Sequence, residues 1–173
     1  MPPQTTQFKR LGESTAIYVE FASNQIGKDN SMSNESEVKP TILHIEDGDD
    51  WLRIVQRACE GAGFSVRRAT TLAKAASLLT SHEFDAIVAD IRLKDWQEDN
   101  IEGLEALDSL PKNKRPAAVV LSGFLDADNT RLAFKTFEVS DTIKKSNFDA
   151  RTFVVMLKQA IKATRKMRYE TSH

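Results

Sequence analysis

The sequence predicts an α/β protein in which a five-stranded parallel sheet is covered by helices on both faces. From Pro40 onward, five short apolar segments typical of strands alternate with five segments whose apolar residues recur every three or four positions. The connections are long enough to return each strand parallel to the last. At 173 residues, of which 40% are hydrophobic, the chain can bury the core that such a fold requires.

The first part of this region supplies two strands and two helices. Segment 41–45 predicts the first strand, and segment 64–68 a weaker second one. The helix between them ends at a pair of glycines, and the next helix begins behind Thr70 or Thr71 as its N-cap. The two apolar stripes are Leu52, Val55, Cys59 and Ala62, and Leu72, Ala75, Ala76 and Leu79.

The second part supplies three strands, at 86–89, at 117–121 and around Thr142 and Ile143. A short helix is predicted before Pro111, a second over 132–137, and a third near the end of the chain. The apolar residues that predict the first and third of these helices are Leu104, Leu107 and Leu110, and Phe153, Val154, Leu157 and Ile161.

Two details of these later helices are also predicted. Ser146 and Asp149 have the spacing of a capping box for the last helix. Phe134 and Phe137 are expected in the core, because aromatic side chains at helical spacing usually face inward.

The N-terminal 39 residues differ in composition from the rest. Residues 23–39 are rich in Ser, Asn and charge and show no period, which is typical of a linker. We expect residues 1–39 to form a disordered arm, with a short strand at 15–22 as the alternative for its apolar part. Met32 offers a second start, so whether residues 1–31 are native stays open. The folded domain is expected at 40–168, followed by a tail at 169–173.

Composition excludes several classes of protein. Lys and Arg total 24 against 25 Asp and Glu, a net charge of −1, whereas a protein coated with nucleic acid is normally clearly basic. No stretch approaches the roughly 18 consecutive apolar residues of a membrane span, and the first residues lack the apolar segment of a signal peptide. The single cysteine, Cys59, argues against a disulfide framework or structural zinc. We therefore expect a cytoplasmic protein with no membrane or nucleic-acid partner.

Polar side chains follow four of the predicted strands. Glu46 and Asp47 follow the first, Asp90 the third, Ser122 ends the fourth and Lys145 follows the fifth. Parallel strands bring their carboxyl ends to one edge of the sheet, where such folds bind their ligands. Three clustered carboxylates need a counter-charge, and Mg²⁺ is the natural one because it prefers oxygen ligands. Zinc fits less well, since no His or Cys falls at these positions.

Four segments, ILHIEDGDDW, FDAIVADIRLKD, AAVVLSGF and SDTIKKS, resemble the receiver domain of two-component response regulators. The spacing agrees, with 43 residues from Asp47 to Asp90, 32 onward to Ser122 and 23 onward to Lys145. The resemblance covers Pro40 to about Lys166. It implies a flavodoxin-like (βα)5 three-layer sandwich with strand order 2-1-3-4-5.

The resemblance also implies roles for individual residues. Asp90 would be the phosphoacceptor, Ser122 the switch hydroxyl and Lys145 the phosphate-binding lysine. Mg²⁺, with Mn²⁺ as an alternative, would be held by Glu46, Asp47, Asp90 and the backbone carbonyl of Arg92. The implied phosphoryl donor is a histidine kinase or a histidine phosphotransfer protein, and the protein would be a monomer or weak homodimer.

Three positions depart from the usual pattern of that family. Thr142 stands where receivers usually carry Tyr or Phe, Ser146 where proline usually follows the lysine, and Glu138 where a glycine often ends the fourth helix. The loop after Asp90 is longer than usual and acidic. None of these changes removes a group that the phosphoryl chemistry needs. The way in which receivers usually signal to their partners, however, cannot be carried over to this chain.

The favoured function is a stand-alone response regulator that accepts a phosphoryl group on Asp90 and signals through altered protein contacts. It would catalyse only its own phosphorylation and dephosphorylation and is not otherwise expected to be an enzyme. The alternative is a receiver-like interaction module that works without phosphorylation. A dehalogenase-type phosphatase is disfavoured, because Arg92 occupies the second acidic position of its DxD motif.

Overall fold

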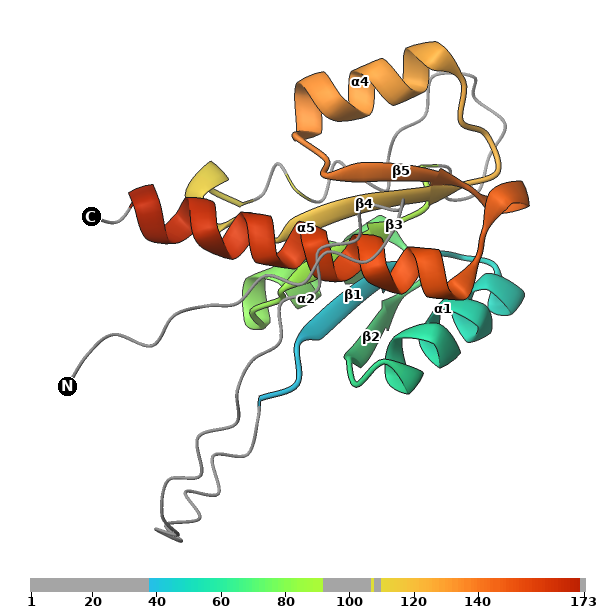
Figure 1. The fold of residues 1–173 in the computed structure, drawn as a ribbon, viewed down its shortest axis with the longest axis horizontal. Helices are drawn as coiled ribbons and strands as arrows, with labels where there is room; N and C mark the ends of the chain where they lie inside the picture. The colour runs from blue at the N-terminus through green and yellow to red at the C-terminus, as the bar shows by residue number, and fades with distance from the viewer. Residues whose placement is uncertain (1–37, 92–106, 108–109, 172–173) are drawn as a thin grey trace, which may run out of the picture. The chain divides into compact units, whose positions relative to one another are not determined.

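The computed structural model describes residues 38–91, 107 and 110–171 (Figure 1). Its strands form one five-stranded sheet in which every neighbouring pair is parallel. The strands are β1 (Thr41–Ile45), β2 (Ser65–Ala69), β3 (Ala86–Ala89), β4 (Ala117–Ser122) and β5 (Asp141–Lys144). Their order, β2-β1-β3-β4-β5, confirms the predicted α/β fold and its strand order.

Helices connect the strands where the apolar stripes predicted them. The described helices are α1 (Asp49–Gly61), α2 (Leu72–Ser81), α4 (Ala127–Phe137) and α5 (Ala150–Thr171), with short 3₁₀ turns at Lys112–Lys114 and Lys145–Asn147. The helix predicted around Leu104 and Leu110 lies largely outside the described residues, as does the arm at 1–37. Helix α5 continues to Thr171, so residues 169–171 extend it rather than forming a separate tail.

The core consists of two apolar layers, one on each face of the sheet. Successive strand residues point to opposite faces, so β1, β3 and β4 each contribute to both layers, whereas β5 contributes only Ile143 to one of them. One layer packs α1 and α5 on the sheet, and the other packs α2 and α4 (Figure 1). The first contains Ile42, Val55, Cys59, Val88, Val119, Leu121, Ile143, Phe153 and Leu157; the second contains Leu43, Ile45, Leu79, Ile87, Ala89, Val120, Ala133 and Phe137.

Two helix caps test the sequence predictions. The hydroxyl of Thr71 accepts the Lys74 N–H at 3.2 Å, which confirms Thr71 as the N-cap of α2. The capping box assigned to Ser146 is wrong, because the Ser146 hydroxyl donates to the side-chain oxygen of Asn147. Asp149 is the cap instead, and its carboxylate accepts the Thr152 N–H at 2.8 Å and the Thr152 hydroxyl at 2.7 Å.

The prediction for the two α4 aromatics was half right. Phe137 is buried with Ala133, four residues before it, whereas Phe134 is 43% exposed. A step of one residue turns a helix by about 100°, so Phe134 leaves the face that Ala133 presents to the sheet.

Glu138, directly after α4, has a backbone φ of +55°. This is the left-handed conformation that often follows a helix and that glycine adopts most easily. Glu138 forms an ion pair with Lys112 at 2.7 Å, and this contact lowers the pKa of its carboxyl group. Glu138 thus adopts a backbone conformation that is unfavourable for a glutamate, and its side chain forms an ion pair in that conformation.

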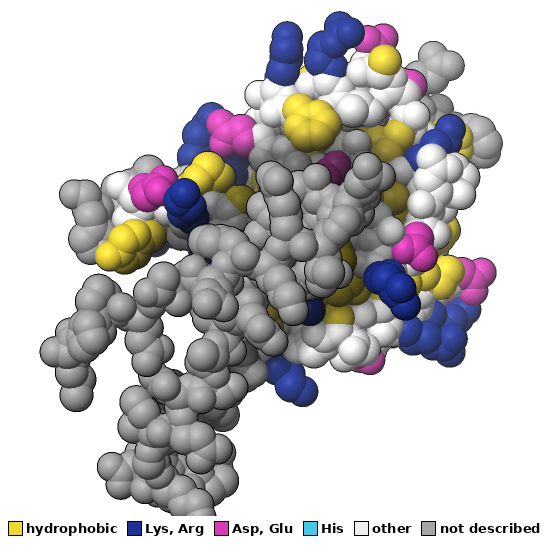
Figure 2. Space-filling view, in the orientation of Figure 1, with side chains coloured by type: hydrophobic (Ala, Val, Ile, Leu, Met, Phe, Trp, Pro, Cys, Tyr) yellow, Lys and Arg dark blue, Asp and Glu magenta, His cyan; other side chains and the backbone are white. Residues whose placement is uncertain are grey.

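Basic and acidic side chains are interspersed over the face shown in Figure 2, in agreement with the net charge of −1. Within the described ranges, no helix combines the length and apolar character needed to cross a bilayer.

Candidate functional site

The carboxyl edge of the sheet brings Glu46 and Asp90 together. Glu46 follows β1 and Asp90 follows β3, and these strands are neighbours in register from Ile42 to Ile45. The Asp90 N–H donates to the Ile45 carbonyl at 2.9 Å, so the ladder continues to the site itself. On the other side, the Glu46 N–H donates to the Ala69 carbonyl at 3.0 Å. Backbone hydrogen bonds thus fix the positions of both acidic residues.

Lys145 follows β5, which is separated from β3 by β4, and its side chain contacts both acids. Its Nζ lies 2.6 Å from Glu46 Oε2 and 2.6 Å from Asp90 Oδ2. The side chains of Lys145, Glu46 and Asp90 are 13%, 2% and 9% exposed, so screening by water is weak. These three groups converge at one edge as predicted, and two buried carboxylates share one ammonium group there.

Burial raises the pKa of the Glu46 carboxyl group, and the neighbouring Asp90 charge acts in the same direction. The hydrogen bond and positive charge of Lys145 oppose this rise in pKa. The Gly48 N–H also donates to Glu46 Oε1 at 2.9 Å. A Cβ at position 48 would lie only 2.9 Å from the same oxygen, so a larger residue there would require the Glu46 carboxylate to shift. Sequence reasoning missed Gly48, although its place directly after the acid pair was a usable signal.

Two further predicted site residues, Ser122 and Asp47, lie at the same edge of the sheet. Ser122, at the end of β4, is fully buried, and its hydroxyl accepts the Phe124 N–H at 3.3 Å. It pairs in register with Lys144, the residue before Lys145. Asp47 is half-buried beside Glu46. Arg92 and the acidic loop that follows it lie outside the described residues.

His44 lies beneath the site in β1 and is fully buried. Neither of its ring nitrogens has a hydrogen-bond partner in the part of the chain that the structure describes. Burial, followed by the positive charges of Lys145 and Arg68, lowers the pKa of His44 to about 3. The imidazole is therefore neutral at physiological pH and adds no charge to the site.

An aromatic cluster lines the α1 side of the triad. Lys145 Nζ lies 5.2 Å from the centre of the Trp51 ring, and Trp51 meets Phe148 edge-on at 5.5 Å between ring centres. Sequence reasoning assigned no role to either aromatic residue, because nothing in a linear pattern links a residue of α1 to one that precedes α5.

The acids at this edge fit a hard divalent cation by the chemistry of their donors. Glu46, Asp47 and Asp90 offer only carboxylate oxygens, which Mg²⁺ prefers. One carboxylate oxygen of Glu46 and one of Asp90 contact the same cationic group, the ammonium of Lys145. Among the described residues, no three acidic, His or Cys side chains lie close enough to form a metal site. The predicted ligand set also includes the Arg92 carbonyl and stays a prediction.

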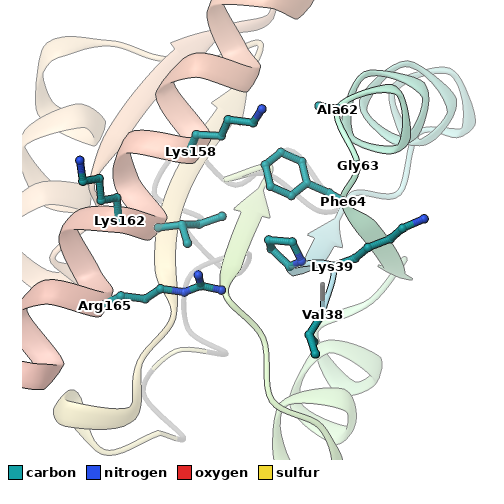
Figure 3. Close-up of a pocket in the computed structure, with 10 residues that line it drawn as sticks. Val38, Lys39, Ala62, Gly63, Phe64, Lys158, Lys162 and Arg165 are labelled. Carbon is teal, nitrogen blue, oxygen red and sulfur yellow. The ribbon is translucent and has the colours of Figure 1, made fainter. Parts of the chain in front are cut away.

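A cavity of about 490 Å³ lies at the opposite, amino edge of the sheet (Figure 3). It opens between the start of β1, the turn before β2 and the second half of α5, and its charged lining is basic: Lys39, Lys158, Lys162 and Arg165. Its lining includes no acidic or hydroxyl side chain, so this cavity holds none of the carboxylates and hydroxyls that lie at the other edge.

Comparisons with known proteins agree with this geometry. Residues 42–158 match the model of the response regulator receiver domain. The photosynthetic apparatus regulatory protein RegA of Rhodovulum sulfidophilum is 33% identical over 87 residues, which cover 49% of this chain and 44% of that protein. The match therefore spans less than half the length of this relative.

Solved structures show the same fold. A CheY-like response regulator receiver protein from Methanospirillum hungatei is 20% identical, with a TM-score of 0.64 over 75% of this chain and 98% of its own. The receiver domain of an HD domain-containing protein from Pseudomonas fluorescens is also 20% identical, with a TM-score of 0.64 over 74% of this chain and 98% of its own. With a family model that covers most of its length, this chain belongs to the response regulator receiver domain family.

Proposed function

We propose that this receiver accepts a phosphoryl group on Asp90 from a phosphohistidine of a histidine kinase or phosphotransfer protein. The observation that carries the proposal is the buried triad, in which Lys145 contacts both Asp90 and Glu46 at 2.6 Å. A lysine placed within contact of a carboxylate nucleophile is also placed to contact a phosphoryl group bonded to it.

In the proposed reaction, a carboxylate oxygen of Asp90 attacks the phosphorus atom of the phosphohistidine. The new O–P bond forms as the P–N bond breaks, the electron pair of that bond returns to the imidazole, and the product is an aspartyl phosphate. Because the transferring group carries dispersed negative charge, catalysis depends on positioning and on nearby positive charge. Lys145 supplies that charge from within the chain.

Glu46 and Asp47, with Asp90, would hold Mg²⁺. The bound ion would neutralise the phosphoryl oxygens and reduce the repulsion between the three acids. Glu46 is prepared for this role because its backbone and one carboxylate oxygen are fixed by hydrogen bonds to Ala69 and Gly48.

The output would be a change in protein contacts. A phosphoryl group adds about −1.5 to −2 charges and three strong acceptor oxygens to a buried site. Lys145 and the Ser122 hydroxyl, at the ends of β5 and β4, are the groups that would respond to it. In this proposal the chain acts in the cytoplasm and catalyses only its own phosphorylation and dephosphorylation.

The proposal is tested by intact-protein mass after incubation with acetyl phosphate, with and without Mg²⁺. The expected result is a gain of one phosphoryl group that requires Mg²⁺ and is absent in Asp90→Asn. Asp85→Asn, at the other end of β3, is the matched control and should still gain the group. If the unaltered protein gains nothing and its tryptophan fluorescence does not respond to Mg²⁺, a phosphorylation-independent interaction module replaces this proposal.

A further inference from the structure

Lys145 has a third neighbour besides the two acids. Its Nζ lies 5.2 Å from the centre of the Trp51 ring, within the roughly 6 Å over which a cation is attracted to an aromatic face. Trp51 is half-buried in the first turns of α1 and packs against the core layer shared with α5. The ammonium group thus lies among two carboxylates and an indole ring.

The Trp51 ring begins a continuous series of aromatic contacts. Trp51 meets Phe148 at 5.5 Å with an interplanar angle of 83°, and Phe148 meets Phe153 at 5.3 Å. Phe153 is fully buried in the first turn of α5. Phe148 is also tied to the site through its backbone, since its N–H donates to the Lys145 carbonyl at 3.3 Å. The contacts therefore run from the phosphoryl site to the start of α5.

This series lies on the opposite face of the sheet from Thr142. Ile143 of β5 belongs to the α1–α5 core layer, so Thr142, one residue earlier, points toward the other face. Thr142 carries no ring, whereas receivers that this chain resembles usually have Tyr or Phe at that position. The aromatic side chains that could move when the site changes therefore lie on the α1–α5 face, and position 142 supplies none.

We propose that Trp51 is a positioning residue for Lys145, and that Trp51 and Phe148 transmit the phosphorylation state of the site to the start of α5. This inference rests on the proposed function. A phosphoryl group on Asp90 would offer Lys145 new acceptor oxygens and draw its ammonium away from its present position. The contact with the Trp51 ring would change at the same moment, and the packed rings would carry the shift to Phe153.

The first test uses Trp51 as its own reporter. The chain has two tryptophans, so Trp96→Phe leaves Trp51 as the sole one. Mass and fluorescence are followed in one sample during incubation with acetyl phosphate and Mg²⁺. The expected result is a change in Trp51 emission at the same rate as the mass gain, with neither change in Asp90→Asn. A full mass gain with constant emission would overturn the inference and leave the proposed function intact.

The second test separates positioning from packing. Trp51→Leu is expected to slow phosphoryl acceptance by about two- to tenfold, and Trp51→Phe to restore most of the rate, because phenylalanine keeps an aromatic face. Phe64→Leu is the matched control, since Lys158 Nζ lies 5.9 Å from the Phe64 ring at the other edge of the sheet.

Phe64→Leu should leave the rate unchanged. Equal rates in Trp51→Leu and Trp51→Phe, or an equal loss in Phe64→Leu, would show that Trp51 acts only through packing. No mass gain in any variant or in the unaltered protein would instead contradict the proposed function.

Discussion

Strand β3 has an aspartate at each end, and the two are held differently. Asp85, before the strand, accepts the Thr41 N–H at 2.8 Å on one oxygen and Arg165 at 2.6 Å on the other. Its side chain is 27% exposed. Asp90, after the strand, also meets a cation at 2.6 Å, but its side chain is 9% exposed and its partner Lys145 is shared with Glu46.

The difference distinguishes a carboxylate that joins elements of the fold from the one that we propose as the phosphoacceptor. Asp85 has one cation and a backbone donor as partners, so its charge is balanced and it ties the start of β1 and the second half of α5 to β3. At the other end two buried acids share one ammonium, and a further acid, Asp47, follows in sequence. Among the described residues of that edge the acids outnumber the lysine, and a divalent cation would offset their negative charge.

Removing the cation at each end is the strongest way to test the comparison. Lys145→Met removes the ammonium group that two buried carboxylates share and should lower the free energy of unfolding by about 3 kcal/mol at neutral pH. It should also abolish phosphoryl acceptance. Chemical denaturation in the absence of divalent ions measures the first effect. A loss no larger than that of Arg165→Met would contradict the account of the site.

The pH dependence of stability tests the neutral His44 beneath the site. Its pKa is about 3 in the folded protein against an ordinary value of 6.5, so the unfolded chain binds more protons between these values and stability falls as pH falls below 6.5. At pH 5.5 this costs about 1.4 kcal/mol relative to neutral pH.

His44→Leu should remove this contribution. When the unfolding free energies of the two proteins are measured from pH 8 to pH 5, that of the unaltered protein should therefore fall more steeply below pH 6.5, by about 1.4 kcal/mol more at pH 5.5. Curves that stay parallel would show that the buried imidazole takes up a proton in the folded state.

The smallest effect is expected at the amino edge. Arg165→Met removes a pair whose cation is 58% exposed, and exposed pairs typically contribute about 0–1 kcal/mol. Phosphoryl acceptance should be unchanged, because the cavity at that edge contains no group that the reaction uses. Thermal unfolding and the mass assay measure the two quantities, and a loss of acceptance would show that the two edges are coupled.

The strands and most of the site were predictable because both follow from short-range patterns. β1 and β3 begin and end as predicted, since their apolar runs are bounded by polar residues. The convergence of Glu46, Asp90 and Lys145 followed from the rule that parallel strands end at one edge. The rest depended on side-chain placement in three dimensions.

The sharing of Lys145 between two acids depends on its side-chain rotamer, which no spacing encodes. The contact between Trp51 and Phe148 joins α1 to the segment before α5 and forms only when both pack on the sheet. The cap of α5 was misassigned because Ser146 and Asp149 both suit an N-cap, and only the start of the helix at Ala150 decides between them.

Mapping the modified residue shows directly whether Asp90 is the phosphoacceptor. The protein is incubated with acetyl phosphate and Mg²⁺, then reduced with borohydride, which converts an aspartyl phosphate to homoserine, and its peptides are sequenced by mass spectrometry. Homoserine is expected at position 90, with unmodified aspartate at positions 47 and 85. Homoserine at another position, or none in a protein that retains its fold, would contradict the assignment of Asp90.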